Sequence, residues 1–283
     1  MIEIVKRSGE REPFSEEKVR RSLTRSGASK VVEDKVIEKL EKKLYQGITT
    51  AEIYQLVLGW LKQEKALLAS KYNLKQAIVD LGPTGYPFEL FLARLLESFG
   101  FQTKTSQILP GECVQHEVDV IAKTDSFDYL KQVNQPACYL IECKFHGKLG
   151  VKVALKTALY VWGRVCDLQK TPINIFGRKE YFTQGLLATN SKLTSEAIKY
   201  CQCTHLAALS WDYPKGNSLP DLVSKSRKHP LTCLTDLSAR DKQLLFSEGL
   251  VFCQDLLDNF GWQRLFGRRS KKILTQIKEI VSE

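Results

Sequence analysis

A short segment rich in glycine and proline divides this chain into parts of different character. It has the sequence Leu-Gly-Pro-Thr-Gly-Tyr-Pro at residues 81–87, and both residue types interrupt helices and strands. Before it, apolar residues recur at helical spacing, whereas after it strand-like and helical patterns alternate. A polar, basic connector at residues 219–230 ends the alternating part. The sequence therefore predicts three domains, at residues 1–82, 83–221 and 222–283.

The charge balance indicates a possible polyanionic partner. The chain has 42 Lys and Arg residues against 32 Asp and Glu residues, a formal net charge of +10. A basic surface attracts nucleic acids, although the same excess also serves solubility alone. No apolar run of the sequence reaches membrane-spanning length, and the eight cysteines form no C-x-x-C pair. We therefore expect a cytoplasmic protein with no membrane partner and no zinc site.

The first domain is predicted to be a short β-hairpin followed by a helical bundle. Residues 2–6 alternate like a strand, a Ser-Gly pair supplies a turn, and residues 11–14 return antiparallel. Ser15 is placed to cap the first of four helices. Residues 49–52, Thr-Thr-Ala-Glu, have the pattern of a capping box at the start of the third helix.

This arrangement resembles the ATP cone, a domain that regulates ribonucleotide reductases and their transcriptional repressors. The resemblance is carried by Val5-Lys6-Arg7-Ser8-Gly9, Glu12-Pro13-Phe14, Lys18, Gly47-Ile48-Thr49-Thr50 and Tyr72-Asn73-Leu74. It implies a regulatory site for ATP or dATP, with nucleotide contacts from Val5, Lys6, Arg7, Glu12, Lys18 and Thr50. No Walker A motif occurs in the chain, so we expect binding without hydrolysis. The alternative is that the lysines are ordinary solvated side chains.

The second domain is predicted to hold a mixed sheet covered by helices. Helical patterns occur at residues 88–96, 152–168 and 194–203, and strand patterns at residues 101–109, 117–122, 137–144, 181–189 and 206–212. The order αβββαβαβ is typical of a mixed sheet between helices. With a small helical C-terminal region, the whole chain is predicted to be a multidomain α+β protein.

Charged residues interrupt two of these apolar strands. Asp119 lies within one strand, and Glu142 and Lys144 lie near the end of the next, on one side because residues i and i+2 share a face. If the strands pair as a hairpin, Asp119 approaches Glu142, and neighbouring carboxylates repel unless a cation joins them. Oxygen ligands favour Mg²⁺ (or Mn²⁺), and a nearby lysine can orient water or stabilise charge on a phosphate. The alternative is an internal ion pair of Lys144 with either carboxylate.

This spacing resembles the PD-(D/E)xK nucleases. The run Glu142-Cys143-Lys144-Phe145-His146 is similar to the E-C-K-[YFH]-H run of Mrr-type restriction endonucleases, and Arg164 and Asp167 fit the helix that follows. The resemblance spans residues 86–222 and implies a restriction-endonuclease-like fold. It also implies a metal site formed by Asp119, Glu142 and the carbonyl of Cys143, with Lys144 positioning the water and Glu89 as an accessory acid.

Several neighbouring residues are candidates for secondary roles. Glu117 precedes Asp119 by two positions and could replace it as a ligand. His116 and His146 could be surface residues, or His146 could contact a phosphate. Gln184, on a later strand, could help to orient a substrate.

The third segment is predicted to contain helices at residues 241–248, 251–259 and 273–281. A basic run, Arg268-Arg269-Ser270-Lys271-Lys272, precedes the last of them and suits either phosphate contact or a solvated helix end.

These patterns together predict a Mg²⁺-dependent endonuclease that acts on DNA, with ATP or dATP as a regulator. Cleavage of both strands would favour a dimer. The alternative is a non-catalytic, ATP-sensing, DNA-binding regulatory protein built on a nuclease fold.

Overall fold

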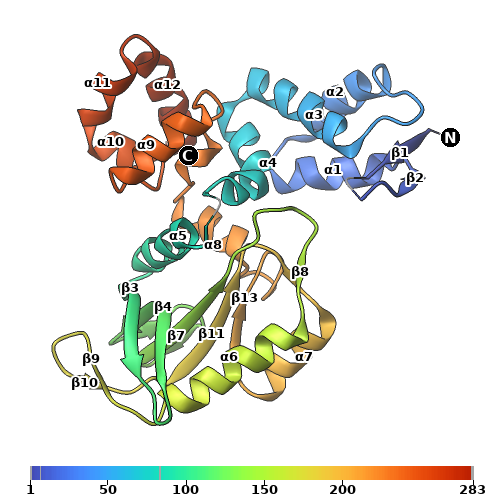
Figure 1. Ribbon diagram of the computed structural model, residues 1–283. Coiled ribbons are helices and arrows are strands. Elements are labelled where there is room, and N and C mark those ends of the chain that lie inside the picture. The colour runs from blue at the N-terminus through green and yellow to red at the C-terminus, as the bar shows by residue number, and fades with distance from the viewer. Residues whose placement is uncertain (1, 7, 83, 282–283) are drawn as a thin grey trace. The chain divides into compact units, whose positions relative to one another are not determined.

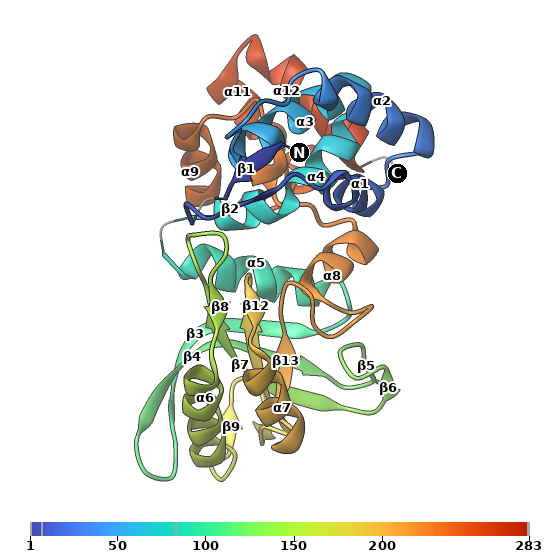
Figure 2. The ribbon, with the colours of Figure 1, turned by 90° about the vertical axis from the view of Figure 1, so that its right-hand side faces the viewer.

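The computed structural model describes residues 2–6, 8–82 and 84–281 (Figures 1 and 2). Of the predicted nucleotide contacts, Arg7 lies outside these residues, as does Pro83 of the predicted domain boundary. No helix in the described ranges combines the length and the apolar character that crossing a bilayer requires.

Internal contacts divide the chain into two compact units. The first unit consists of residues 1–75, 233–238 and 253–283, and the second of residues 76–232 and 239–252. The three sequence domains at residues 1–82, 83–221 and 222–283 remain a prediction.

The first unit begins with the predicted hairpin. Strands β1 (Glu3–Val5) and β2 (Arg11–Pro13) pair antiparallel. The helices that follow are α1 (Glu16–Arg25), α2 (Lys30–Glu41), α3 (Thr50–Glu64) and α4 (Ala66–Val79), the last of which continues into the second unit. Ser15 caps α1, and Thr49 forms a capping box with Glu52 at α3, so both predicted caps are confirmed. Apolar side chains of the hairpin, α1, α2 and α3 share one core.

The C-terminal part of the first unit differs from its prediction. It contains α10 (Asp255–Asp258), a 3-10 turn η2 (Phe260–Trp262), α11 (Gln263–Phe266) and α12 (Arg269–Val281). The predicted helix at 251–259 starts only at Asp255, because residues 251–253 are buried and Phe252 forms a β-bridge with Pro230. The basic run lies mostly inside α12 rather than before it, and two of its members, Arg269 and Lys272, contact Asp236.

A mixed five-stranded sheet forms the centre of the second unit. Its strands are β3 (Gln102–Pro110), β4 (Gln115–Thr124), β7 (Ala137–Lys144), β11 (Gln184–Thr189) and β13 (Ala207–Leu209), in the spatial order β13-β11-β7-β4-β3. The β3–β4 and β4–β7 pairs are antiparallel, whereas β7, β11 and β13 run parallel. The predicted mixed sheet is therefore confirmed.

Helices cover this sheet in the predicted order. Helices α6 (Leu155–Leu168) and α7 (Ser195–Cys203) share a buried core with Ile121 and Leu140 of the sheet, and α5 (Tyr86–Glu97) packs against β3 and β4 (Figure 2). α6 begins three residues later than predicted, because Lys152 and Val153 form β8, which pairs with β12.

Smaller elements complete the unit. They are β5 (Phe127–Asp128), β6 (Val133–Asn134), β8 (Lys152–Val153), β9 (Ile173–Asn174), β10 (Lys179–Glu180), β12 (Lys192–Leu193), η1 (Leu231–Cys233), whose last residue belongs to the first unit, and α9 (Ala239–Ser247).

A helix occupies most of the predicted connector at residues 219–230. Helix α8 (Leu219–Ser226) buries Leu219, Leu222 and Val223. The prediction of a plain connector is wrong here because Ser218 and Asp221 form a capping box, a signal that the polar composition of the segment obscured.

The turn between β3 and β4 is fastened to α6 by one carboxylate. The backbone N–H groups of Cys113 and Val114 donate to Asp167, at 2.8 and 3.3 Å, and Nε2 of His116 lies 2.7 Å from the same carboxylate. These bonds, with His116 the largest contributor, hold the pKa of Asp167 well below its usual range. The ionised side chain therefore stabilises the hairpin.

Replacing this carboxylate should destabilise the protein in a pH-dependent way. Because the folded-state pKa of Asp167 is lowered, its contribution is present above the unfolded pKa of about 3.9 and is lost as the pH falls below it. We expect Asp167→Asn to unfold more easily than the wild type at pH 7, and the difference to shrink below about pH 4. Urea denaturation over this pH range measures it. The control Glu112→Gln, at an exposed neighbour, should change little, and equal effects of both variants would contradict the assignment.

Candidate functional site

Asp119 lies where the pairing of β4 ends toward β7 and is interrupted toward β3. Toward β7 the ladder ends at Val120, so Asp119 and Glu142 come directly after its last pair. Toward β3 the register omits Ser106, the residue opposite Asp119, which has a left-handed φ of +51°. Left-handed conformations are uncommon for residues other than glycine and are enriched at functional sites.

Each of the two predicted carboxylate ligands is held through one oxygen. The N–H of Cys143 donates to Oδ2 of Asp119 at 2.7 Å, and Arg164 on α6 donates through Nη1 to Oε2 of Glu142. Within the part of the chain that the structure describes, the second oxygen of each carboxylate receives no hydrogen bond from the protein. These two oxygens are therefore available to a ligand.

Burial and the charge of neighbouring carboxylates disfavour ionisation of the acidic side chains around Asp119. Burial raises the pKa of Glu142 to about 7, and the charge of Asp119 adds to this effect. Burial likewise raises the pKa of Glu89 to about 7, followed by the charges of Asp119 and Glu117. The pKa of Asp119 itself is raised, chiefly by burial. A bound cation would reverse these effects, because opposite charge favours the ionised form.

The alternative considered for Lys144, an internal ion pair with Glu142 or Asp119, does not form among the described residues. Glu142 pairs with Arg164, whereas Lys144 is exposed and has no ion pair among residues 2–6, 8–82 and 84–281. Sequence reasoning placed Arg164 on the helix but missed its role. The available signal was a charged residue among the buried positions of α6, next to Val161 and Val165.

The loop after the E-C-K run is fixed by the segment that follows β11. Asn190 accepts from the N–H of His146 at 2.8 Å and donates to its carbonyl at 2.9 Å. Thr189 donates to the carbonyl of Lys144 at 2.6 Å, and Ser191 lies 3.1 Å from Nδ1 of His146. Burial, with a smaller effect of Lys144, lowers the pKa of His146. This network holds the backbone at Lys144 in place.

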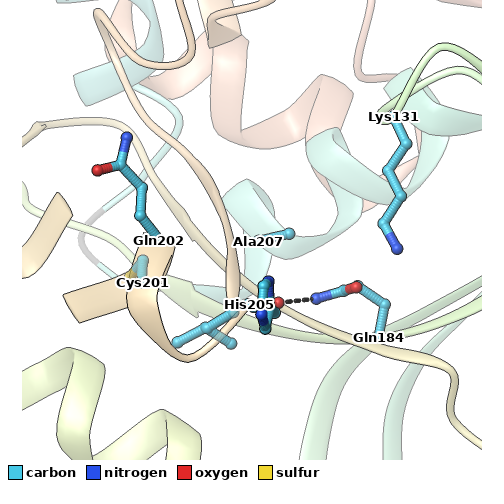
Figure 3. A pocket seen from close by; sticks show the side chains of 7 residues that line it. Lys131, Gln184, Cys201, Gln202, His205 and Ala207 are labelled. Atoms are coloured by element: carbon cyan, nitrogen blue, oxygen red, sulfur yellow. Dashed lines mark hydrogen bonds between the residues drawn. The ribbon is translucent and has the colours of Figure 1, made fainter. Parts of the chain in front are cut away.

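Gln184 lies at the other end of the sheet from Lys144. It pairs in register with Tyr139 near the start of β7, whereas Thr189 pairs with Lys144 at the end. Its side chain donates to the carbonyl of His205 beside a cavity of about 430 Å³, lined by Lys131, Gln184, Cys201, Gln202, His205, Leu206 and Ala207 (Figure 3). Gln184 is therefore not part of the acidic site, and its role in orienting a substrate stays a prediction.

Another group of metal-ligand atoms lies at the β3–β4 turn. Within the described residues, ligand atoms of Glu112, Cys113 and Asp167 lie within 4.8 Å of one another. The hydrogen bonds that Asp167 accepts from this turn account for the cluster without an ion. The predicted set of Asp119, Glu142 and the Cys143 carbonyl is of another kind, because one of its ligands belongs to the backbone.

The predicted nucleotide contacts gather at the hairpin of the first unit. Glu12 pairs with Lys6 at 2.9 Å and with Lys18 at 3.0 Å. The N–H of Val5 donates to the carbonyl of Ile48 at 3.0 Å, which brings β1 beside the start of α3, where Thr50 is the first residue. The five described residues of the predicted set therefore lie on neighbouring elements.

Comparison with known proteins identifies both ends of the chain. Residues 2–75 match the ATP cone domain, and residues 229–281 match the family model described as AF1548-like, C-terminal. An uncharacterized protein of Archaeoglobus fulgidus is 33% identical over 196 residues, which are 67% of this chain and 99% of that protein. The chain belongs to the AF1548-like family. Its N-terminal hairpin and helices form an ATP cone domain.

Two solved structures resemble this AF1548-like protein. The crystal structure of AF1548, a protein of unknown function, is 34% identical with a TM-score of 0.53 and covers 70% of this chain and 96% of its own. The MspJI restriction endonuclease in complex with a 27-mer oligonucleotide is 12% identical with a TM-score of 0.35, covering 76% of this chain and 36% of its own. That second likeness is too low to establish fold or function.

The left-handed backbone at Ser106 should tolerate glycine and reject a β-branched residue. We expect Ser106→Val to lower the free energy of unfolding by about 1–2 kcal/mol, because its Cβ is strained at this φ. Ser106→Gly should remain within about 1 kcal/mol of the wild type. The control Gln102→Val places the same side chain at an exposed, regular position of β3. Equal stabilities of the two valine variants in urea denaturation would refute the argument.

Proposed function

We propose that this protein is a metal-dependent endonuclease that hydrolyses DNA phosphodiester bonds. The observation that supports this most directly is the geometry of Asp119 and Glu142. Among the described residues, each carboxylate has one oxygen fixed by a protein donor and one oxygen without a protein partner. Lys144 follows Glu142 on the same face of β7. The resemblance of Glu142-Cys143-Lys144 to the Mrr-type run supplies the reaction class.

The donor set at this site suits a hard divalent cation. Carboxylate and carbonyl oxygens from Asp119, Glu142 and Cys143 would hold Mg²⁺ or Mn²⁺, and Glu89 would contribute through a water molecule. When bound, such an ion polarises a phosphate oxygen and makes water a better nucleophile. Burial is the main cause of the raised pKa values of Glu89 and Glu142, and the negative charge of Asp119 adds to it. A cation at this site would favour the ionised form of both side chains.

The protein side chains would divide the remaining tasks. Lys144 would orient the attacking water and stabilise negative charge that develops on the phosphate. The loop network around Asn190 fixes the backbone on either side of Phe145, which limits the motion of the lysine's main chain. The net charge of +10 would favour the encounter with DNA.

Removing the Lys144 ammonium group should abolish most of the activity. We expect Lys144→Ala to reduce Mg²⁺-dependent cleavage of plasmid DNA by about 100- to 1,000-fold, the usual effect of losing one transition-state stabiliser. The control Lys148→Ala removes an exposed lysine four residues further on and should cleave normally. Equal cleavage by Lys144→Ala and the wild type would refute the catalytic assignment. DNA binding without any Mg²⁺-dependent cleavage by the wild type would favour the non-catalytic regulator.

We also propose that ATP or dATP binds the cone and regulates this activity. Lys6 and Lys18, both held by Glu12 in the structure, would turn to the triphosphate, while the start of α3 at Thr50 would contribute backbone N–H groups. The presence of an ATP cone domain at residues 2–75 supports this assignment.

Loss of one cone lysine should weaken nucleotide binding. We expect Lys18→Met to raise the dissociation constant for ATP by about 10- to 100-fold, the equivalent of one hydrogen bond to a charged group. Isothermal titration calorimetry measures the constant. Lys43→Met, at an exposed lysine of the same unit, is the matched control and should bind ATP as the wild type does. An unchanged dissociation constant for Lys18→Met would show that Lys18 does not contact the nucleotide.

A further inference from the structure

Arg164 is a charged side chain at a position that packing alone would fill with an apolar residue. It is only 9% exposed, and Val161, Val165 and Leu168 on the same helix are fully buried. Its Nε atom is buried and has no hydrogen-bond partner within the described residues. Burying a guanidinium group with an unsatisfied donor is costly, so its other contacts must account for its presence.

Those contacts join the two strands that carry the acidic site. Nη1 donates to the carboxylate of Glu142 on β7, and Nη2 donates to the backbone carbonyl of Glu117 on β4, two residues before Asp119. The regular β4–β7 ladder has already ended at Val120, so Arg164 bridges the strands where their own hydrogen bonds stop. The ring of Tyr160 lies 5.5 Å from the guanidinium carbon and supports it from the same helix.

We propose that Arg164 is a positioning residue for the metal site. This inference rests on the proposed function. By fixing one oxygen of Glu142, Arg164 leaves the other oxygen for the cation. By holding the Glu117 carbonyl, it sets the distance between β4, which carries Asp119, and β7, which carries Glu142. A planar guanidinium reaches two acceptors on separate strands at once, whereas a lysine ammonium on a single flexible stem does not reproduce this fork. Loss of a residue that hydrogen-bonds to a metal ligand commonly weakens metal binding by about 10- to 100-fold.

Manganese binding to the full chain, without DNA, tests this role. Isothermal titration with Mn²⁺ alone gives a dissociation constant that does not depend on catalysis. We expect Arg164→Met to raise this constant by about 10- to 100-fold and Arg164→Lys to raise it by a smaller factor. Arg178→Met, which removes an exposed arginine of the same unit, should bind Mn²⁺ as the wild type does. Thermal unfolding of each variant establishes that it is folded.

The outcomes separate the inference from the function on which it rests. If the wild type binds no Mn²⁺ at millimolar concentration, the proposed metal site itself fails. If the wild type binds Mn²⁺ and Arg164→Met binds it equally well or more tightly, Arg164 does not position the ligands, and the proposed function stands. If Arg164→Met fails to fold, Mn²⁺ binding by Arg164→Lys tests the proposal instead. A dissociation constant of Arg164→Lys equal to that of the wild type then overturns the proposal.

Discussion

Burial and mutual repulsion both disfavour charge on the carboxylates at the end of the β4–β7 ladder. Burial raises the pKa of Glu89 and of Glu142 to about 7, and in both cases the charge of Asp119 raises it further. Two protein donors offset part of the free-energy cost of keeping these carboxylates ionised. They are the N–H of Cys143, which donates to Asp119, and the guanidinium of Arg164, which donates to Glu142. The remaining unfavourable energy is what a divalent cation would relieve, because it interacts with all of these groups at once.

Irregular backbone is what allows these groups to meet. A regular antiparallel ladder would commit the main chain at Asp119 and Glu142 to inter-strand hydrogen bonds. Instead the ladder ends at Val120, the β3 side is interrupted by the left-handed Ser106, and the N–H of Cys143 is left to donate to a side chain. Strain at Ser106 and the buried charge of Arg164 both cost stability, and both occur beside the same carboxylates.

The periodicity of the sequence is sufficient to predict the sheet, but it is not sufficient to predict the side-chain contacts within the site. The strand at 137–144 was predicted with its observed bounds because a continuous apolar run between polar segments has few other structures available. Helix α8 was missed because its capping box lies in a polar, proline-containing segment. Arg164 is 22 residues from Glu142 and on another element, so no local pattern encodes their contact. The left-handed backbone at Ser106 likewise has no signal in the sequence, since serine adopts it only under tertiary constraint.

A structural ion pair alone does not explain the composition of this cluster. Arg164 neutralises Glu142, yet Asp119 and Glu89 add further negative charge, and Lys144 is exposed without an ion pair in the described part of the chain. A buried pair is favourable only when charges balance and the remaining lone pairs are satisfied. Here one oxygen of each central carboxylate, Asp119 and Glu142, has no donor in the part of the chain that the structure describes. Because apolar residues at these positions would make an inert scaffold more stable, the surplus of oxygen ligands supports the proposed cation site.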